Sequence, residues 1–178
     1  GACVLSLACH VPREGVTGRL YVGCSDGSIR LWEDASSSAA AAGAKRGWKC
    51  CGRISVEGEA NDKSTTTTPI PTRIWALCAL TDGTIASGDS LGHVQLWDGT
   101  RGTLVQSFRQ NENNADVFDI AVSGDGLSLF ASGVDSKVVR FRRGKGEEGG
   151  KWFTVDMVRK NSHDVRSLTI CRSGGGTG

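Results

Sequence analysis

The chain has 178 residues, enough for one sizeable hydrophobic core, and a formal net charge of +2 with 22% charged residues. This balance excludes the strong field of a histone-like protein or of one that binds acidic substrates over its whole surface, so contact with nucleic acid must be local. The 25 glycines against 3 prolines indicate tight turns rather than a disordered linker. These features favour a β-rich protein.

One pattern of alternating apolar residues occurs four times along the chain. It begins at Val4, Ile74, Val117 and Val165, and the last two intervals are 43 and 48 residues. After each of the first three occurrences come a turn, a strand of small residues, a second turn and an apolar strand that ends in an aromatic residue. These aromatic residues are Trp32, Trp97 and Phe141. A period in the forties with several short strands per unit is typical of the blades of a β-propeller.

The sequence therefore predicts an all-β chain of about three four-stranded antiparallel blades and the first strand of a fourth. The blades are expected at 1–58, 72–110 and 115–160, and the further strand at 161–171. Low-complexity sequence forms an insertion at 35–47 and a linker at 59–71, and we expect the tail 172–178 to be disordered. Because three blades cannot close a ring, we expect an incomplete propeller that is part of a longer protein.

Two carboxylates recur at one place in these repeats. Asp26 and Asp135 each stand six residues before the terminal aromatic residue, inside a turn. A carboxylate there accepts hydrogen bonds from backbone amides and stabilises the turn. General acid or base catalysis is less favoured, because no second carboxylate or nucleophile repeats beside them. In the second repeat Leu91 holds this position and Asp89 lies two residues earlier, so we expect a different turn there.

These units resemble WD40 repeats, in which a turn Asp, a His at the start of a strand and the strand aromatic form a structural network. The resemblance implies structural roles for one set of residues across the repeats. They are Asp26, Trp32, Trp97, Asp135, Phe141 and His163. The spacer that follows His163 is shorter than is usual in the family.

No motif for catalysis or cofactor binding occurs in the sequence. The seven cysteines include no C-x-x-C pair, and the three histidines do not pair with them at a spacing that suits a metal. Nucleophile elbows, P-loops and dinucleotide fingerprints are absent from the sequence as well. We therefore expect no catalytic activity, no cofactor or metal, no small-molecule substrate and no membrane partner.

Positive charge is concentrated in one stretch, which also contains Glu147 and Glu148. The cations are Arg140, Arg142, Arg143, Lys145 and Lys151. The stretch is either a solvated loop or a contact site for RNA phosphates or an acidic partner. No aromatic residues alternate with the cations, so base stacking is not predicted.

Arg140 also occupies the position that Leu31 and Leu96 hold in the other repeats. It therefore either reaches a polar edge of the blade or marks a contact surface.

A more particular resemblance runs from Ile74 to Leu168. Its residues are Asp82-Gly-Thr-Ile-Ala-Ser-Gly-Asp-Ser-Leu-Gly-His-Val-Gln-Leu-Trp-Asp98, Ala115-Asp-Val117, Phe130-Ala-Ser-Gly-Val-Asp-Ser-Lys-Val-Val-Arg-Phe141 and His163-Asp-Val-Arg-Ser-Leu168. These segments resemble the cirhin family, whose Gly-Asp-Ser-x-Gly turn matches the unusual second turn. The similarity fails at the two low-complexity segments.

This resemblance implies a non-enzymatic nucleolar scaffold of WD40 propellers within the small-subunit processome. Its expected partners are other processome subunits and, directly or indirectly, the 5′ external spacer of pre-ribosomal RNA, in support of rRNA processing and small-subunit maturation. The alternative is a WD40 scaffold or substrate receptor in ubiquitin ligation or signalling. Such a protein would co-purify with ligase subunits and without pre-ribosomal RNA.

The turn role of Asp26 can be tested by substitution. We expect Asp26→Ala in the full-length protein to lower the midpoint of denaturation, because losing a buried hydrogen-bonded acceptor costs roughly 1–3 kcal/mol. An unchanged midpoint in urea unfolding would count against a structural role for this carboxylate.

Overall fold

The structure is a computed structural model that describes residues 1–10, 18–34, 47–56, 72–110, 115–144, 150–158 and 161–171. The described residues form twelve β-strands and no helix, so none of them belongs to a helix that could cross a membrane. The strands are β1 (Val4–His10), β2 (Arg19–Cys24), β3 (Ser28–Asp34), β4 (Trp48–Ser55), β5 (Ile74–Ala79), β6 (Thr84–Asp89), β7 (His93–Asp98), β8 (Leu104–Arg109), β9 (Val117–Val122), β10 (Ser128–Gly133), β11 (Val138–Arg143) and β12 (Trp152–Val158).

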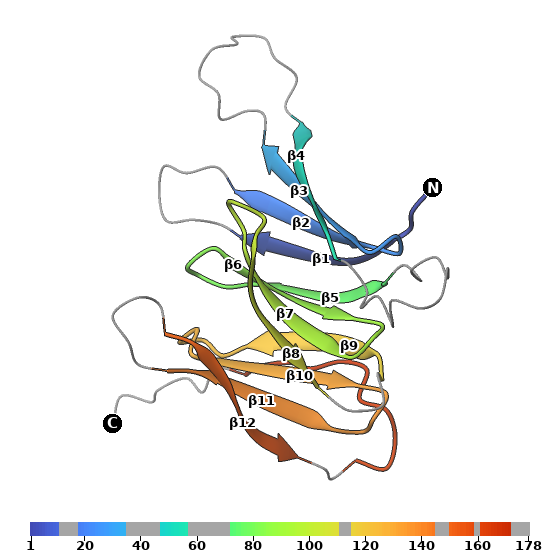
Figure 1. Ribbon diagram of the computed structural model, residues 1–178, viewed down its shortest axis with the longest axis vertical. Coiled ribbons are helices and arrows are strands. Elements are labelled where there is room, and N and C mark those ends of the chain that lie inside the picture. The colour runs from blue at the N-terminus through green and yellow to red at the C-terminus, as the bar shows by residue number, and fades with distance from the viewer. Residues whose placement is uncertain are drawn as a thin grey trace, which may run out of the picture.

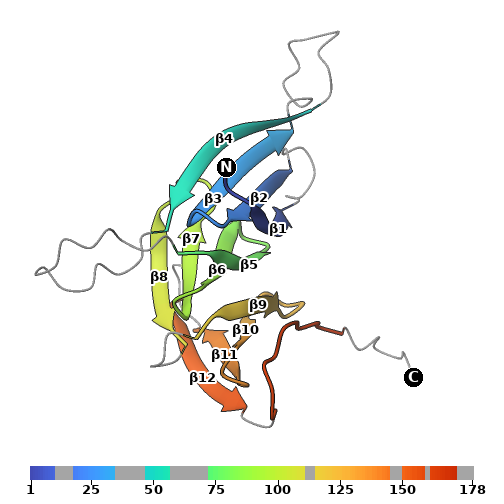
Figure 2. The same cartoon turned by 90° about the vertical axis from the view of Figure 1, so that its right-hand side faces the viewer.

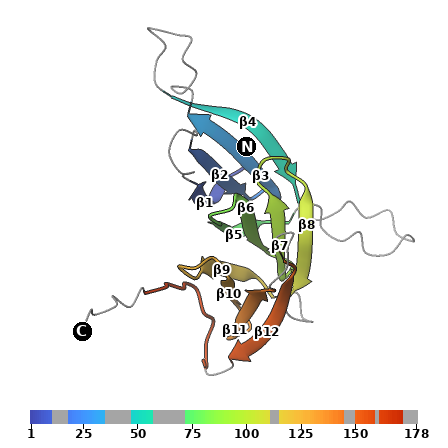
Figure 3. The same cartoon turned by 90° about the vertical axis from the view of Figure 1, so that its left-hand side faces the viewer.

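The strands form three antiparallel four-stranded sheets, each made of four consecutive strands. The sheets β1–β4, β5–β8 and β9–β12 are stacked one after another as blades (Figure 1). The fourth strands β4, β8 and β12 follow one curved side of the stack, and the first strands β1, β5 and β9 lie on the other (Figures 2 and 3). This arrangement confirms the expected all-β fold of propeller blades that do not close into a ring.

The hydrophobic core lies between the blades rather than inside any one of them. Side chains alternate across each strand, so a central blade covers its predecessor with one face and its successor with the other. The first interface joins Tyr21, Ile29, Leu31, Ile54 and Val56 of the first blade to Ile74, Leu77, Ile85 and Trp97 of the second. The second interface joins Ala76, Leu80, Ala86, Val94 and Leu96 to Val117, Ile120, Leu129, Val139, Phe141 and Trp152.

Glycines bring each blade close to the inner strand of the next. A Cβ atom on Gly88 would lie 2.6 Å from Cγ1 of Val117, and one on Gly23 would lie 2.8 Å from Cγ2 of Ile74. Carbon atoms do not pack at such distances, so only glycine leaves room for the neighbouring strand.

The outer strands of the second and third blades are tied by one side chain. The amide of Gln106 on β8 donates from Nε2 to the carbonyl of Trp152 at 2.8 Å, and its Oε1 accepts from the Trp152 N–H at 3.0 Å. One glutamine thus satisfies both main-chain groups of a residue on β12.

The segment 161–171 contains no assigned strand, although it lies against the third blade. The Val165 N–H donates to the carbonyl of Gly133 at 3.0 Å, and the Leu168 N–H donates to Oδ2 of Asp119 at 2.7 Å. Its assignment as the first strand of a further blade stays a prediction.

The predicted low-complexity insertion, linker and tail are not described. Of these segments, residues 35–46, 59–71 and 172–178 lie outside the described residues.

The close approach at Gly88 gives a stability prediction. Gly88→Ala should lower the free energy of unfolding by about 1–3 kcal/mol, because Val117 must move to admit a methyl group. Gly52→Ala in β4 is the control, since its Cβ would meet Leu31 at an ordinary 3.7 Å. Equal losses for the two variants in urea unfolding would contradict this account.

Candidate interaction surface

The carboxylate of Asp26 closes the turn between β2 and β3. Its Oδ1 accepts from the hydroxyl and, at 3.2 Å, from the N–H of Ser28, and its Oδ2 pairs with Arg30 at 3.3 Å and Arg53 at 3.4 Å. The Ser28 hydroxyl is the main cause that lowers the pKa of Asp26, against the opposing effect of partial burial. The side chain is 32% exposed, so the cost of Asp26→Ala should lie near the lower end of the range above, at about 1 kcal/mol.

The second blade uses another turn, as its sequence predicts. Asp89 is buried, and its Oδ1 accepts from the N–H groups of Leu91 at 2.8 Å and His93 at 2.9 Å. Its Oδ2 lies 3.2 Å from Nδ1 of His93. In the third blade Asp135 accepts from the N–H of Lys137 at 3.4 Å and pairs with its ammonium group at the same distance. The carboxylates of the three turns therefore make different local contacts, and Oδ2 of Asp135 is buried with no hydrogen-bond partner among the described residues.

The terminal aromatic residues also differ between blades. In the second blade Nε1 of Trp97 donates to the buried hydroxyl of Ser87 at 2.9 Å. Trp32 has Val22 at the position of Ser87, and its buried Nε1 has no hydrogen-bond partner among the described residues. Phe141 needs no acceptor, and Ala131 stands at the same position.

Phe141 instead packs against Phe108 of the second blade, with 4.9 Å between ring centroids.

His163 is exposed, and its Nδ1 lies 2.8 Å from the hydroxyl of Ser162. Within the described ranges no hydrogen bond joins it to Asp135, and its structural role stays a prediction. The turn carboxylates and terminal aromatic residues therefore make different contacts in the three blades, and the structural roles that the resemblance implies for them stay predictions.

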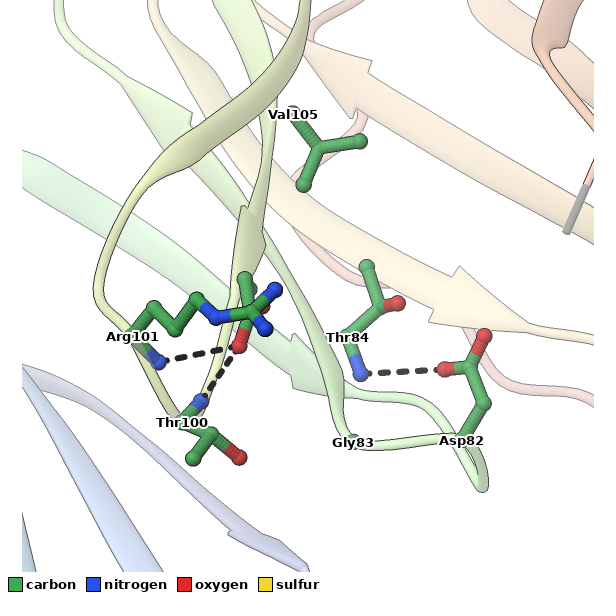
Figure 4. A pocket seen from close by; sticks show the side chains of 7 residues that line it. Asp82, Gly83, Thr84, Thr100, Arg101 and Val105 are labelled. Carbon is green, nitrogen blue, oxygen red and sulfur yellow. Dashed lines mark hydrogen bonds and ion pairs between the residues drawn. The ribbon is translucent and has the colours of Figure 1, made fainter. Parts of the chain in front are cut away.

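The turns β5–β6 and β7–β8 enclose a pocket of about 410 Å³ at one rim of the second blade (Figure 4). Two carboxylates line it. Asp82 accepts from the N–H of Thr84 at 2.9 Å, and Asp98 accepts from those of Thr100 at 2.8 Å and Arg101 at 2.9 Å. The N–H groups of Arg101 and Thr100 lower the pKa of Asp98. These carboxylates hold turns in place and are charged at neutral pH.

One cation of the predicted basic cluster, Arg143, forms an ion pair with a carboxylate that lines this pocket. Nη1 of Arg143 lies 2.6 Å from Oδ2 of Asp82, across the boundary between the second and third blades. Burial opposes the charged form of Asp82, but the Thr84 N–H and Arg143 outweigh it, and the pKa of Asp82 is lowered. Arg143 of the third blade therefore links that blade to the second through its ion pair with Asp82.

The remaining cations of the cluster separate into two kinds. Arg140 is half-buried, with its guanidinium carbon 5.9 Å from the centre of the Phe130 ring. Arg142 and Lys151 are exposed. Lys145 lies outside the described residues. Among the described cations of the cluster, Arg142 and Lys151 are therefore the exposed ones, and contact with RNA or an acidic partner stays a prediction.

Sequence reasoning missed two residues that carry interactions here, Ser87 and Asp82. A signal for Ser87 was present, because Ser87 and Trp97 are replaced together by Ala131 and Phe141 in the third repeat. Nothing in the pattern identified Asp82, whose partner Arg143 is 61 residues away in the chain. No three or more His, Cys, Asp or Glu side chains within the described ranges gather into a metal-binding group.

Comparison with known proteins gives matches over most of the chain and a family-model match near its beginning. Residues 1–33 match the family model for the WD domain, G-beta repeat, so the chain carries a WD40 repeat. The chain is 34% identical to the U3 small nucleolar RNA-associated protein 4 of Schizosaccharomyces pombe over 158 residues, 86% of this chain and 19% of that protein. The Saccharomyces cerevisiae protein of the same name is 31% identical over 157 residues, 86% of this chain and 18% of its own length.

The Mus musculus homolog of that protein is 35% identical over 98 residues, 53% of this chain and 14% of its own. The chain is therefore homologous to proteins of this name and spans about a fifth of the length of the first two.

The pairing of Ser87 with Trp97 can be measured by a double-mutant cycle. Ser87→Ala should cost about 1–3 kcal/mol, because it leaves the buried indole N–H without an acceptor. In a Trp97→Phe background the same change should cost little, because the pair then matches Ala131 and Phe141 of the third blade. Equal costs in both backgrounds would show that the hydrogen bond contributes nothing.

Proposed function

We propose that this chain is part of a non-enzymatic WD40 scaffold of the cirhin family, located in the nucleolus as a subunit of the small-subunit processome. In that role it supports pre-rRNA processing and maturation of the small ribosomal subunit. The observation that carries the proposal is the similarity to two yeast proteins named for association with U3 small nucleolar RNA, over 86% of this chain. An alignment of that length must extend into all three blades.

The contacts of the described residues agree with a scaffold. The carboxylates of Asp26, Asp82, Asp89 and Asp98 are bound by amides, hydroxyls or cations of their own turns and neighbouring blades. Groups held in this way fix the loops in place rather than exchange protons with a substrate. Rigid blades that present variable loops suit an assembly with several partners.

Contact with pre-ribosomal RNA or an acidic partner is assigned to the exposed cations Arg142 and Lys151. They lie on either side of the segment that joins β11 to β12, and Lys145 lies between them in the sequence, outside the described residues. Cations on a rigid strand end bind phosphates without reading the base sequence.

The proposal is tested by crosslinking and immunoprecipitation of the full-length protein, with sequencing of the bound RNA and identification of the bound proteins. Enrichment of the pre-ribosomal 5′ spacer together with processome subunits is expected. Recovery of ubiquitin-ligase subunits without pre-ribosomal RNA would overturn it and favour the alternative scaffold.

A matched pair of variants tests the contact surface. Lys151→Glu should reduce crosslinking of RNA or of an acidic partner at the third blade by roughly threefold or more, because it replaces an attractive charge by a repulsive one. Lys49→Glu is the control, since Lys49 is also an exposed lysine near the start of an outer strand. An equal effect of the two variants would remove the assignment to this loop.

A further inference from the structure

The inner strands of the three blades each carry a β-bulge at the same place. In β1, β5 and β9 the pairing with the following strand skips the second residue, which is therefore not held in the pleat of the sheet. The skipped residues are Leu5, Trp75 and Phe118, which are large, apolar and half-buried. Because a bulge re-aims a side chain and this one recurs in every blade, these positions are a feature of the repeat.

Two of the bulged side chains contact each other and an arginine. The rings of Trp75 and Phe118 meet edge to face, with 6.1 Å between centroids and 75° between planes. The guanidinium carbon of Arg166 lies 5.7 Å from the centre of the Phe118 ring. Arg166 follows Val165 as Phe118 follows Val117, so it holds the same position of the repeat. We call Trp75, Phe118 and Arg166 the aromatic row.

The aromatic row lies outside the hydrophobic core and borders a hollow. Among the described residues, neither aromatic side chain belongs to a core cluster or packs against one. Arg166 is exposed and lines a hollow of about 480 Å³ formed by residues 161–166. Aromatic rings and arginines beside a hollow are the usual anchors of protein–protein interfaces.

Charges around the aromatic row are balanced. The residues two positions before Trp75, Phe118 and Arg166 are Arg73, Asp116 and Asp164. Together with Arg166 itself they give two cations and two anions. An RNA surface depends on an excess of cations, which this set does not provide. An aromatic centre in balanced surroundings fits a protein partner instead.

We propose that the aromatic row binds a protein partner through an extended segment. This segment places a large apolar side chain against Trp75 and Phe118 and a carboxylate against Arg166. The apolar side chain gains contact with rings that the core does not use. The carboxylate accepts hydrogen bonds from the exposed guanidinium.

This surface is separate from the cations assigned to RNA contact. Val117 at the start of β9 pairs with Gly133, whereas Arg142 pairs with Ser128, so the two surfaces lie at opposite ends of β10. The inference is therefore independent of the proposed role in ribosome biogenesis.

The test uses the full-length protein as bait and a phage-displayed library of random linear peptides as the probe. The wild type should enrich peptides in which a large apolar residue lies beside Asp or Glu. Trp75→Ala should weaken an enriched peptide by roughly tenfold or more in fluorescence anisotropy, because an interface loses most of its affinity with its aromatic anchor. No enrichment over a surface without the protein, or equal binding by Trp75→Ala, overturns the proposal.

A charge reversal keeps the test decisive if Trp75→Ala fails to fold. Arg166→Glu should enrich peptides with Lys or Arg in place of the acid, a change that unfolding cannot produce, and an unchanged selection overturns the role of Arg166. Phe153→Ala is the matched control, because Phe153 is an aromatic residue 56% exposed on the outer strand β12. An equal loss from it would overturn the assignment to the aromatic row.

Single-stranded oligouridylate is the competing probe. Loss of its binding in Trp75→Ala, with no peptide enriched by the wild type, would overturn the choice of a protein partner and favour RNA.

Discussion

The spacing between one blade and the inner strand of the next is the constraint on which this structure depends. It is set where Gly23 meets Ile74 and where Gly88 meets Val117, with no side chain between the backbones. Once the inner strands are this close, the apolar faces further out come into contact and bury the residues of both core clusters. The hydrogen bonds of Gln106 and the ion pair between Arg143 and Asp82 depend on the same spacing, because they join groups on different blades.

The three repeats share the same strand register, but residues that contact each other differ together from one repeat to the next. Ser87 accompanies Trp97, and Ala131 accompanies Phe141, so the hydroxyl is present where an indole N–H needs an acceptor. The first blade departs from this rule, because Trp32 has Val22 beside it. The three blades therefore share their strand order and register, but not their polar contacts.

The sequence was sufficient to predict features that depend on neighbouring residues. Alternation along single strands predicted the blades, because burial of one face of a strand has a period of two. The turn role of Asp26 followed from the residues of the turn itself. The ion pair between Arg143 and Asp82 could not be predicted, because it joins turns of different blades and depends on how the sheets are stacked. The sequence placed Arg140 at the position of Leu31 and Leu96 but left its exposure open, because exposure depends on what packs over that face of the third blade.

The glutamine that ties two outer strands has a consequence for how such a chain tolerates changes in length. Gln106 is bonded to both main-chain groups of a single residue, Trp152, so sliding β12 by one residue would present it with the wrong donor and acceptor. Insertions and deletions between Arg143 and Trp152 can therefore accumulate in the loop without shifting the strand that follows. The Gln106 side chain thus fixes the register of β12, so the segment that joins β11 to β12 within the third blade can vary in length.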